Sequence, residues 1–481
     1  MRIFIAIEPS EHVKARIFHE LETLQDKNLF NGKFVEKQNL HIKLKFLGDI
    51  SEEKLEEIQR RVEHHGKYRR LCLNMIASEN SVSPAALAVM GSDLANRYTV
   101  SGKLDPEIRF FPGLRKFYNG LEASAIEMAR NALGAEYVTL HPVSGMMANM
   151  VAYYALINPG DTVFSVRERH GGHYSHRRGA DGEGLVQTML DFYGAKVDYL
   201  PFDGEEYDLD YDAIETMLTE AKVKPKLLIV GASEMLFPID LPRLRDICDR
   251  CGDGTKILYD AAHVAGLIFG GRFQKPLEEG ADMFSTSTNK SLGGVDHGLV
   301  AWNDPAYNAR VEHALVPLFT SNHHAQEVAS VAVTLAENVD FGEEYADQVV
   351  RNSKALGQAL YENGVDIVAA HKGFSESHMV LARIGDHANK VKDALERANI
   401  ILSLCHMPED GGETETGLRI GTGEMTRMGM TEDVMTYVGE LMARVINNHA
   451  DEANAEQVRD DVEKLTALYQ KQKYCYQPVT K

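Results

Sequence analysis

Strand and helix patterns alternate along the middle of the chain, and this alternation constrains the fold more than any other feature. Helical periodicity covers residues 121–133 and 145–157, and strand-like runs cover residues 137–141 and 159–165. The alternation continues to about residue 302. Strands that alternate with helices form mostly parallel sheets, because each crossover helix packs on a face of the sheet. The sequence therefore predicts an α/β domain.

The two flanks of this region have other patterns. Residues 1–65 contain two alternating strand patterns and two helical patterns, which predicts a short α+β appendage. After residue 325, long helical patterns stand beside short strands, and residues 450–469 form a helical tail. We therefore predict an appendage at 1–65, a large domain at 66–325 and a smaller α+β domain at 326–481.

Composition excludes some classes of protein. The 481 residues carry a formal net charge of −20, so a nucleic-acid partner is not expected. No apolar run is long enough to span a bilayer, and the first residues turn polar too early for a secretory signal. The five cysteines are scattered, and Cys248 and Cys251 lie on the apolar stripe of a helical pattern, so we expect neither disulfides nor a metal site. A cytoplasmic location is expected.

Two neighbouring segments carry the chemistry of the chain. Residues 256–263 read as an apolar strand that ends in Asp260, and residues 285–294 read as a hydroxyl-rich turn that presents Lys290. A lysine among small hydroxyl residues and glycines can form a Schiff base, and an aspartate can keep a pyridinium nitrogen protonated. The spacing alone also fits an ordinary solvated lysine. Together with the flanking residues it favours pyridoxal 5′-phosphate (PLP) as cofactor.

The amino-terminal part of the chain resembles a known family. Residues 2–14 and 39–48 are similar to the first half of the RNA 2′,3′-cyclic phosphodiesterase and 2′-5′ RNA ligase family. That family grips a cyclic phosphate between two His-x-Thr motifs. Here one motif is present, at His41, and Lys43 stands in place of its threonine. We therefore expect no such activity from residues 1–65.

From about residue 71 to its end, the chain resembles serine hydroxymethyltransferase in its archaeal form. The likeness is carried by residues 75–80, 142–145, 170–176, 260–266, 289–290, 316–324, 341–345, 376–378 and 417–422. The resemblance implies PLP fold type I, the aspartate-aminotransferase-like fold, with a mostly parallel sheet in the large domain. It also implies an amino acid as substrate and a homodimer.

The resemblance assigns roles to single positions. It implies that the cofactor is bound by Lys290, Asp260, His263, His173, Ser144, Gly145, Ser233, Tyr98 and Gly294. Lys290 and His263 are the implied catalytic residues. Arg419 is implied to clamp the substrate carboxylate with help from Ser78, and Tyr98 and Gly294 to reach the phosphate across a dimer interface.

The chain departs from the family at the one-carbon chemistry. Val100 stands where the family has a glutamate that transfers protons, and Phe110 and Phe111 stand where it has tyrosines. Asn289 replaces the usual histidine before the lysine. Glu107 or Tyr118 could fill these positions. Losing a proton-transfer group costs on the order of 10²–10⁴ in rate, so hydroxymethyl transfer is either lost or altered.

Three functions remain open from the sequence. The first is interconversion of serine and glycine with a tetrahydropterin, of the folate or methanopterin type, as one-carbon carrier. The second is a pterin-independent aldolase or transaldolase acting on β-hydroxy amino acids. The third is binding of RNA ends through residues 1–65, with the PLP fold as an inactive scaffold.

Overall fold

The computed structural model describes residues 2–7, 15, 19, 42–49, 52–101, 103–179, 188–410 and 414–477. The chain divides into two compact units, Met1–Arg70 and Leu71–Lys481. In the first unit, β1 (Arg2–Ile7) pairs antiparallel with β2 (Ile42–Asp49), and α2 covers Glu52–Arg70. The predicted boundary after residue 65 falls inside α2. His41 lies outside the described residues, as does most of the first of the two helical patterns predicted within residues 1–65.

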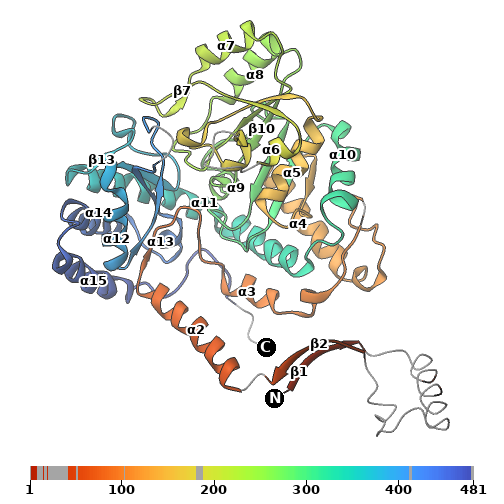
Figure 1. The fold of residues 1–481 in the computed structure, drawn as a ribbon, viewed down its shortest axis with the longest axis horizontal. Helices are drawn as coiled ribbons and strands as arrows, with labels where there is room; N and C mark the ends of the chain where they lie inside the picture. The colour runs from red at the N-terminus through yellow and green to blue at the C-terminus, as the bar shows by residue number, and fades with distance from the viewer. Residues whose placement is uncertain are drawn as a thin grey trace, which may run out of the picture. The chain divides into compact units, whose positions relative to one another are not determined.

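A seven-stranded sheet forms the centre of the second unit (Figure 1). Its strands lie in the order β4 (Tyr137–Thr139), β12 (Gly298–Trp302), β11 (Met283–Ser287), β10 (Lys256–Asp260), β9 (Leu227–Val230), β5 (Thr162–Ser165) and β6 (Lys196–Tyr199). β12 pairs antiparallel with β11 and with β4, and the other pairings are parallel. The predicted mostly parallel sheet is confirmed.

Helices bury both faces of this sheet, so successive strand residues enter opposite cores. On β9, Leu228 and Val230 lie in one core, and Leu227 and Ile229 lie in the other. The first core also contains residues of α4 (Tyr118–Leu133), α7 (Tyr211–Glu220), α8 (Leu241–Cys251) and α9 (Ala265–Phe269). The second contains residues of α5 (Gly145–Leu156) and α10 (Asn308–His313).

A smaller α+β layer follows the long helix α11 (Ala325–Glu362), which contacts both α4 and α14 (Glu432–Asn447). Its antiparallel sheet has the order β13 (Asp366–Ile367), β14 (Met379–Arg383), β17 (Gly417–Gly421) and β16 (Ser403–Cys405). Its helices are α12 (Ala388–Arg397), α14 (Glu432–Asn447) and α15 (Glu452–Thr466).

An early segment of the chain packs with this layer. β3 (Leu73–Asn74) pairs parallel with β15 (Ile400–Ile401), and Leu73 and Met75 are fully buried in the same core as α12 and α14. Residues 73–75 therefore contact the smaller layer, although they lie within the predicted segment 66–325. The division at 325 and 326 stays a prediction.

Three predictions made from short stretches of sequence can be compared with the structure. The hydroxyl-rich segment before Lys290 is not wholly a turn, because residues up to Ser287 belong to β11 and pair with β10 and β12. Cys248 and Cys251 lie on α8, and burial raises the pKa of the Cys248 thiol to about 12. Among the described residues, no helix is long and apolar enough to cross a membrane.

Candidate active site

Polar side chains gather where the parallel strands of the central sheet end. Asp260 is the last residue of β10, and Lys290 follows the end of β11. Ser144 follows β4, His173 follows β5, and Ser233 follows β9. Strands that run in one direction bring their carboxyl ends to one edge of the sheet, where α/β enzymes bind ligands. The topology therefore brings these predicted residues to one edge.

The Asp260 carboxylate is held by a buried hydrogen-bond network. Its Oδ2 accepts bonds from Asn149 Nδ2 and His176 Nε2, both at 2.9 Å, and its Oδ1 accepts from the Ala262 N–H at 2.9 Å. Because a carboxylate only accepts, His176 carries its proton on Nε2, and its Nδ1 accepts from the Tyr153 hydroxyl at 2.5 Å.

This network keeps Asp260 ionised. Burial acts to raise the pKa of Asp260, but the hydrogen bond from His176 and the interactions with His176 and His173 outweigh it, so the pKa lies below its usual value. An ionised carboxylate fixed in this way suits a cationic ring nitrogen. The sequence interpretation missed Asn149 and Tyr153. His176 lies in the segment that carries the family likeness, but no role was given to it.

The ammonium group of Lys290 has a lowered pKa. Burial lowers the pKa of its ammonium group to about 8; Asp260 acts in the opposite direction, and Arg419 adds to the lowering. Its backbone carbonyl accepts a hydrogen bond from Asn80 Nδ2 at 3.1 Å, which ties the lysine loop to the segment after β3. A lysine with a lowered pKa in a buried polar setting is a candidate nucleophile.

Three further imidazoles, those of His173, His263 and His378, interact electrostatically with Lys290. The rings of His263 and His378 lie 5.7 Å apart between centroids, at 24°. Burial is the largest cause that lowers the pKa of His173 to about 3 and of His378 to about 4, and it places the pKa of His263 well below the usual value. The rings are therefore neutral at pH 7. Within the described part of the chain, the buried Nδ1 atoms of His263 and His378 have no hydrogen-bond partner.

The amino-terminal end of α5 offers an anion site. Ser144 caps the helix, and its hydroxyl accepts from the Met147 N–H at 3.2 Å. A Cβ at Gly145 would lie 2.8 Å from the Ser287 Cβ, so glycine is required there. The Ser287 hydroxyl is buried and lacks a partner among the residues described. Free N–H groups and a helix dipole suit a phosphate group, and Ser287 adds a donor that the sequence interpretation missed.

Arg419 lies on β17 and faces the segment after β9. Its Nε donates to Ser403 Oγ at 3.2 Å, and one terminal nitrogen donates to the Ser233 carbonyl oxygen at 3.4 Å. The same nitrogen lies 3.5 Å from Glu234 Oε1. Ser78 is half-buried just after Ala77, whose carbonyl accepts from His378 Nε2 at 3.0 Å. Arg419 and His378 both interact electrostatically with Lys290.

Tyr98 and Gly294 are the two residues that the resemblance assigns to the phosphate across a dimer interface. The Tyr98 side chain is 58% exposed, and its ring packs edge-on against Phe111 with centroids 5.4 Å apart. Gly294 is buried, and its N–H donates to the Thr288 carbonyl oxygen at 2.8 Å. A role for Tyr98 and Gly294 at the phosphate of a partner chain stays a prediction.

The departures from the family pattern have distinct surroundings. Val100 is buried, whereas Phe110 and Phe111 are exposed. Tyr118 is buried beneath the Arg109 guanidinium, which lies 4.8 Å from the ring centroid, and its hydroxyl has no partner in the described ranges. Glu107 is exposed and accepts a 3.3 Å bond from an asparagine, Asn119. Glu107, the carboxylate expected to take the place of the family's glutamate, is therefore exposed, whereas Val100 is buried.

A second buried cluster has the residue types of a metal site. Glu122, His141 and His323 place their ligand atoms within 4.8 Å of one another. However, the Arg109 guanidinium pairs with Glu122, and the two imidazole rings stack at 3.8 Å and 13°. Stacked rings direct their nitrogen lone pairs side by side rather than toward one point. We therefore interpret the cluster as a buried ion-pair network that holds Arg109 against the end of β4.

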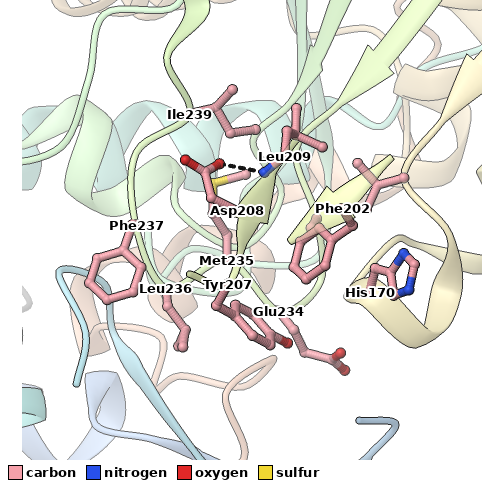
Figure 2. A pocket seen from close by; sticks show the side chains of 12 residues that line it. His170, Phe202, Tyr207, Asp208, Leu209, Glu234, Met235, Leu236, Phe237 and Ile239 are labelled. Atoms are coloured by element: carbon pink, nitrogen blue, oxygen red, sulfur yellow. Dashed lines mark hydrogen bonds between the residues drawn. The ribbon is translucent and has the colours of Figure 1, made fainter. Parts of the chain in front are cut away.

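Close to Arg419 lies a small pocket of about 30 Å³, lined by Val166, His170, Phe202, Tyr207, Asp208, Leu209, Ala232, Glu234, Met235, Leu236, Phe237 and Ile239 (Figure 2). Most of its wall is apolar. Figure 2 shows Glu234 beside Tyr207 at one end of it, and the two side chains interact electrostatically.

Comparisons with known proteins agree with this arrangement. A family model described as serine hydroxymethyltransferase matches residues 51–442, and one described as LigT-like phosphoesterase matches residues 7–68. A serine hydroxymethyltransferase from Methanopyrus kandleri is 36% identical over 427 residues, covering 88% of this chain and 95% of the relative. One from Korarchaeum cryptofilum is 38% identical, with coverages of 86% and 95%. The solved structure of L-threonine transaldolase from Pseudomonas fluorescens has a TM-score of 0.78 at 22% identity, covering 88% of this chain and 94% of that one, which shows a shared fold.

Proposed function

Because the chain belongs to the serine hydroxymethyltransferase family, we propose that it interconverts serine and glycine with a tetrahydropterin as one-carbon carrier. It is a PLP-dependent enzyme of the transferase or aldolase type, with PLP fold type I. The observation that carries the proposal is the buried, ionised Asp260 beside a low-pKa Lys290, with Arg419 close by.

The residues at the sheet edge fit pyridoxal phosphate. Ser144, Gly145 and Ser287 offer donors for its phosphate, and Asp260 offers an ionised partner for its ring nitrogen. His173 and His263 are neutral and so can lie against an aromatic ring without charge repulsion. When bound, the cofactor supplies an electron sink for negative charge at the substrate Cα.

The protein residues supply binding and proton transfer. With a pKa of about 8, Lys290 is partly unprotonated near neutral pH, so it can bond to the cofactor aldehyde and move a proton at the substrate Cα. Arg419 clamps the substrate carboxylate through two N–H groups, and Ser78 assists it. Asp260 would keep the ring nitrogen protonated, because its lowered pKa leaves the carboxylate ionised near neutral pH.

A pterin-independent aldolase or transaldolase on β-hydroxy amino acids is the second candidate. It is favoured by Val100, which is buried and cannot transfer protons, and by exposed Phe111 in place of a tyrosine. By the family resemblance, these two positions serve the one-carbon chemistry. The fold shared with an L-threonine transaldolase is compatible with this candidate.

The test is glycine release from serine by purified, PLP-loaded protein, with and without reduced folate or methanopterin. Release that requires a pterin supports hydroxymethyl transfer. Release from threonine, but not from serine, in the absence of pterin supports the aldolase instead. A protein whose cofactor spectrum does not respond to glycine or serine would refute both.

We propose no catalytic role for residues 1–65, because the sequence carries one motif of the two that a phosphodiesterase needs. An RNA gel shift tests the remaining alternative, binding of RNA ends. Tight, salt-sensitive binding that is lost in His41→Ala would support it.

We also propose a cytoplasmic location.

Deleting residues 1–65 should leave cofactor binding and the spectral response to glycine unchanged within about twofold. The reason is that the unit Leu71–Lys481 contains its own sheets and cores. Absorbance titration of the truncated and full-length proteins measures both quantities. A soluble truncated protein that cannot hold PLP would contradict the expected boundary.

We propose that the enzyme is a homodimer and that its interface includes exposed aromatic side chains between residues 98 and 117. Tyr98, Phe110 and Phe117 are 58%, 65% and 78% exposed. Large apolar groups that gather on a surface mark an interface. The family resemblance independently places Tyr98 at a partner's phosphate.

Replacing both Phe110 and Phe117 by glutamate should convert the dimer to a monomer and weaken PLP retention, because charges would be buried at the interface. Light scattering and cofactor dialysis measure the two effects. Phe192→Glu is the matched control, since Phe192 is 79% exposed on α6 (Met189–Phe192), in another part of the chain. A double variant that stays dimeric would contradict this interface.

A further inference from the structure

A buried carboxylate shares the guanidinium that is proposed to bind substrate. Glu234 is 9% exposed, and its Oε1 lies 3.5 Å from the Arg419 terminal nitrogen that also donates to the Ser233 carbonyl. Its Oε2 is buried and has no hydrogen-bond partner among the described residues. One long ion pair compensates poorly for burying a carboxylate. Glu234 is therefore held in an ionised form only weakly.

The surroundings of Glu234 reinforce this conclusion. The titratable and charged groups that act on it are Arg419 on β17, Glu415 before β17, Glu168 after β5, Tyr207, and Cys405 on β16. His170 and Asp208 line the adjoining pocket, and Figure 2 shows the Asp208 carboxylate directed away from Glu234. Burial raises the pKa of Glu234 to about 7; Arg419 opposes this, while Glu415 and Glu168 add to it. Near neutral pH the side chain is thus divided between its two protonation states.

Arg419 has limited room for two carboxylates. Its Nε is committed to Ser403, and one terminal nitrogen serves Ser233 and Glu234. A substrate carboxylate that docks on the guanidinium brings a second negative charge next to Glu234. Two carboxylates that share one site cannot both stay ionised without cost, and the pKa of one of them rises.

We propose that Glu234 is a specificity-determining residue that competes with the substrate α-carboxylate for Arg419 and takes up a proton when an amino acid binds. This inference rests on the proposed role of Arg419. It predicts a site that favours small amino acids with a single carboxylate, since a second acidic group would meet Glu234. Glu234 carries a proton when the amino acid is bound. The affinity for the amino acid is therefore highest at pH values below the pKa of Glu234 in the free enzyme, and it falls as the pH rises through that pKa.

The test is a glycine titration of the full-length, PLP-loaded protein, followed by cofactor absorbance at pH 6.0 and pH 8.5. Glu234→Gln should bind glycine about as well as the parent at pH 6.0 and roughly tenfold more tightly at pH 8.5, which corresponds to about one pKa unit. Calorimetry at pH 7.5 in two buffers of different ionisation enthalpy should show proton uptake that is lost in the variant.

The matched control is Asp208→Asn. Asp208 lines the same pocket, but its Oδ1 accepts bonds from the Leu209 N–H and the Tyr211 hydroxyl, which an asparagine oxygen can also accept. This control should keep the pH dependence of the parent. If Glu234→Gln fails to fold, Glu234→Leu provides the same comparison, because it also removes the titrating group.

The outcomes separate the two proposals. If the parent binds glycine, and both Glu234 variants keep its pH dependence and proton uptake, the role of Glu234 is overturned while the proposed function stands. If the parent shows no glycine response at either pH, the proposed function is overturned and this inference falls with it.

Discussion

Lys290→Ala should abolish the covalently held, yellow form of the protein and reduce amino-acid turnover to background. The side chain is the amine proposed to bond the cofactor, and its pKa of about 8 makes it reactive near neutral pH. Asp260 and the amino-terminal end of α5 remain in the variant, so free PLP should still bind, although reversibly. Absorbance spectra and borohydride reduction followed by mass spectrometry measure the covalent link.

Lys275→Ala is a suitable control, because Lys275 is an exposed lysine whose ammonium group pairs with the neighbouring Glu278. It should keep the colour and the reducible link. The assignment of Lys290 would be refuted by a Lys290→Ala protein that still retains cofactor after borohydride reduction and denaturation.

Arg419→Ala should weaken glycine binding on the order of 10²–10³-fold, since truncating one partner of a desolvated charge pair costs roughly 2–5 kcal/mol. PLP binding should change little, because the proposed cofactor contacts come from the edge of the central sheet rather than from β17. Arg419→Lys should recover only part of the loss, since an ammonium group cannot form the planar, two-bond contact of a guanidinium. Glycine and PLP titrations, each followed by absorbance, separate the two effects.

Equal losses of glycine and PLP affinity in Arg419→Ala would contradict the clamp role. The paired measurement also guards against misfolding, because a disordered site would lose both ligands. Arg383→Ala on the neighbouring strand β14 controls for removal of a positive charge nearby. Arg383 pairs with exposed Glu409 instead of Glu234.

Several parts of the fold followed from local pattern. The helix expected at 145–157 is α5 (Gly145–Leu156), and the strand expected to end in Asp260 is β10. The 2-residue and 3.6-residue periods are set by which face of an element is buried, so they are visible without the tertiary structure. The turn expected before Lys290 was wrong at residues 285–287, because short hydroxyl residues do not reveal that β12 pairs with all three of them and β10 with Ser285.

The site could be predicted only in part. Lys290 and Asp260 were predicted because PLP chemistry requires those residue types, and Arg419 was predicted from the family resemblance; their roles stay predictions. Asn149 was missed because it lies on α5, whose mostly apolar sequence shows no separate polar face. Glu234 was missed for a different reason: its neighbour Ser233 fitted the family pattern, and nothing local indicates that Arg419 lies beside it.

By itself, the sequence determined the alternation of strands and helices and the family, because these depend on residue type and on short periods. It also predicted the groups that would carry PLP chemistry. Only the tertiary structure decided which charged and polar side chains lie close enough to interact. Asp260 meets His176, and Arg419 meets Glu234, across segments far apart in the chain. Burial and neighbouring charges set the pKa values of these groups, and both arise only when separate strands come to one edge.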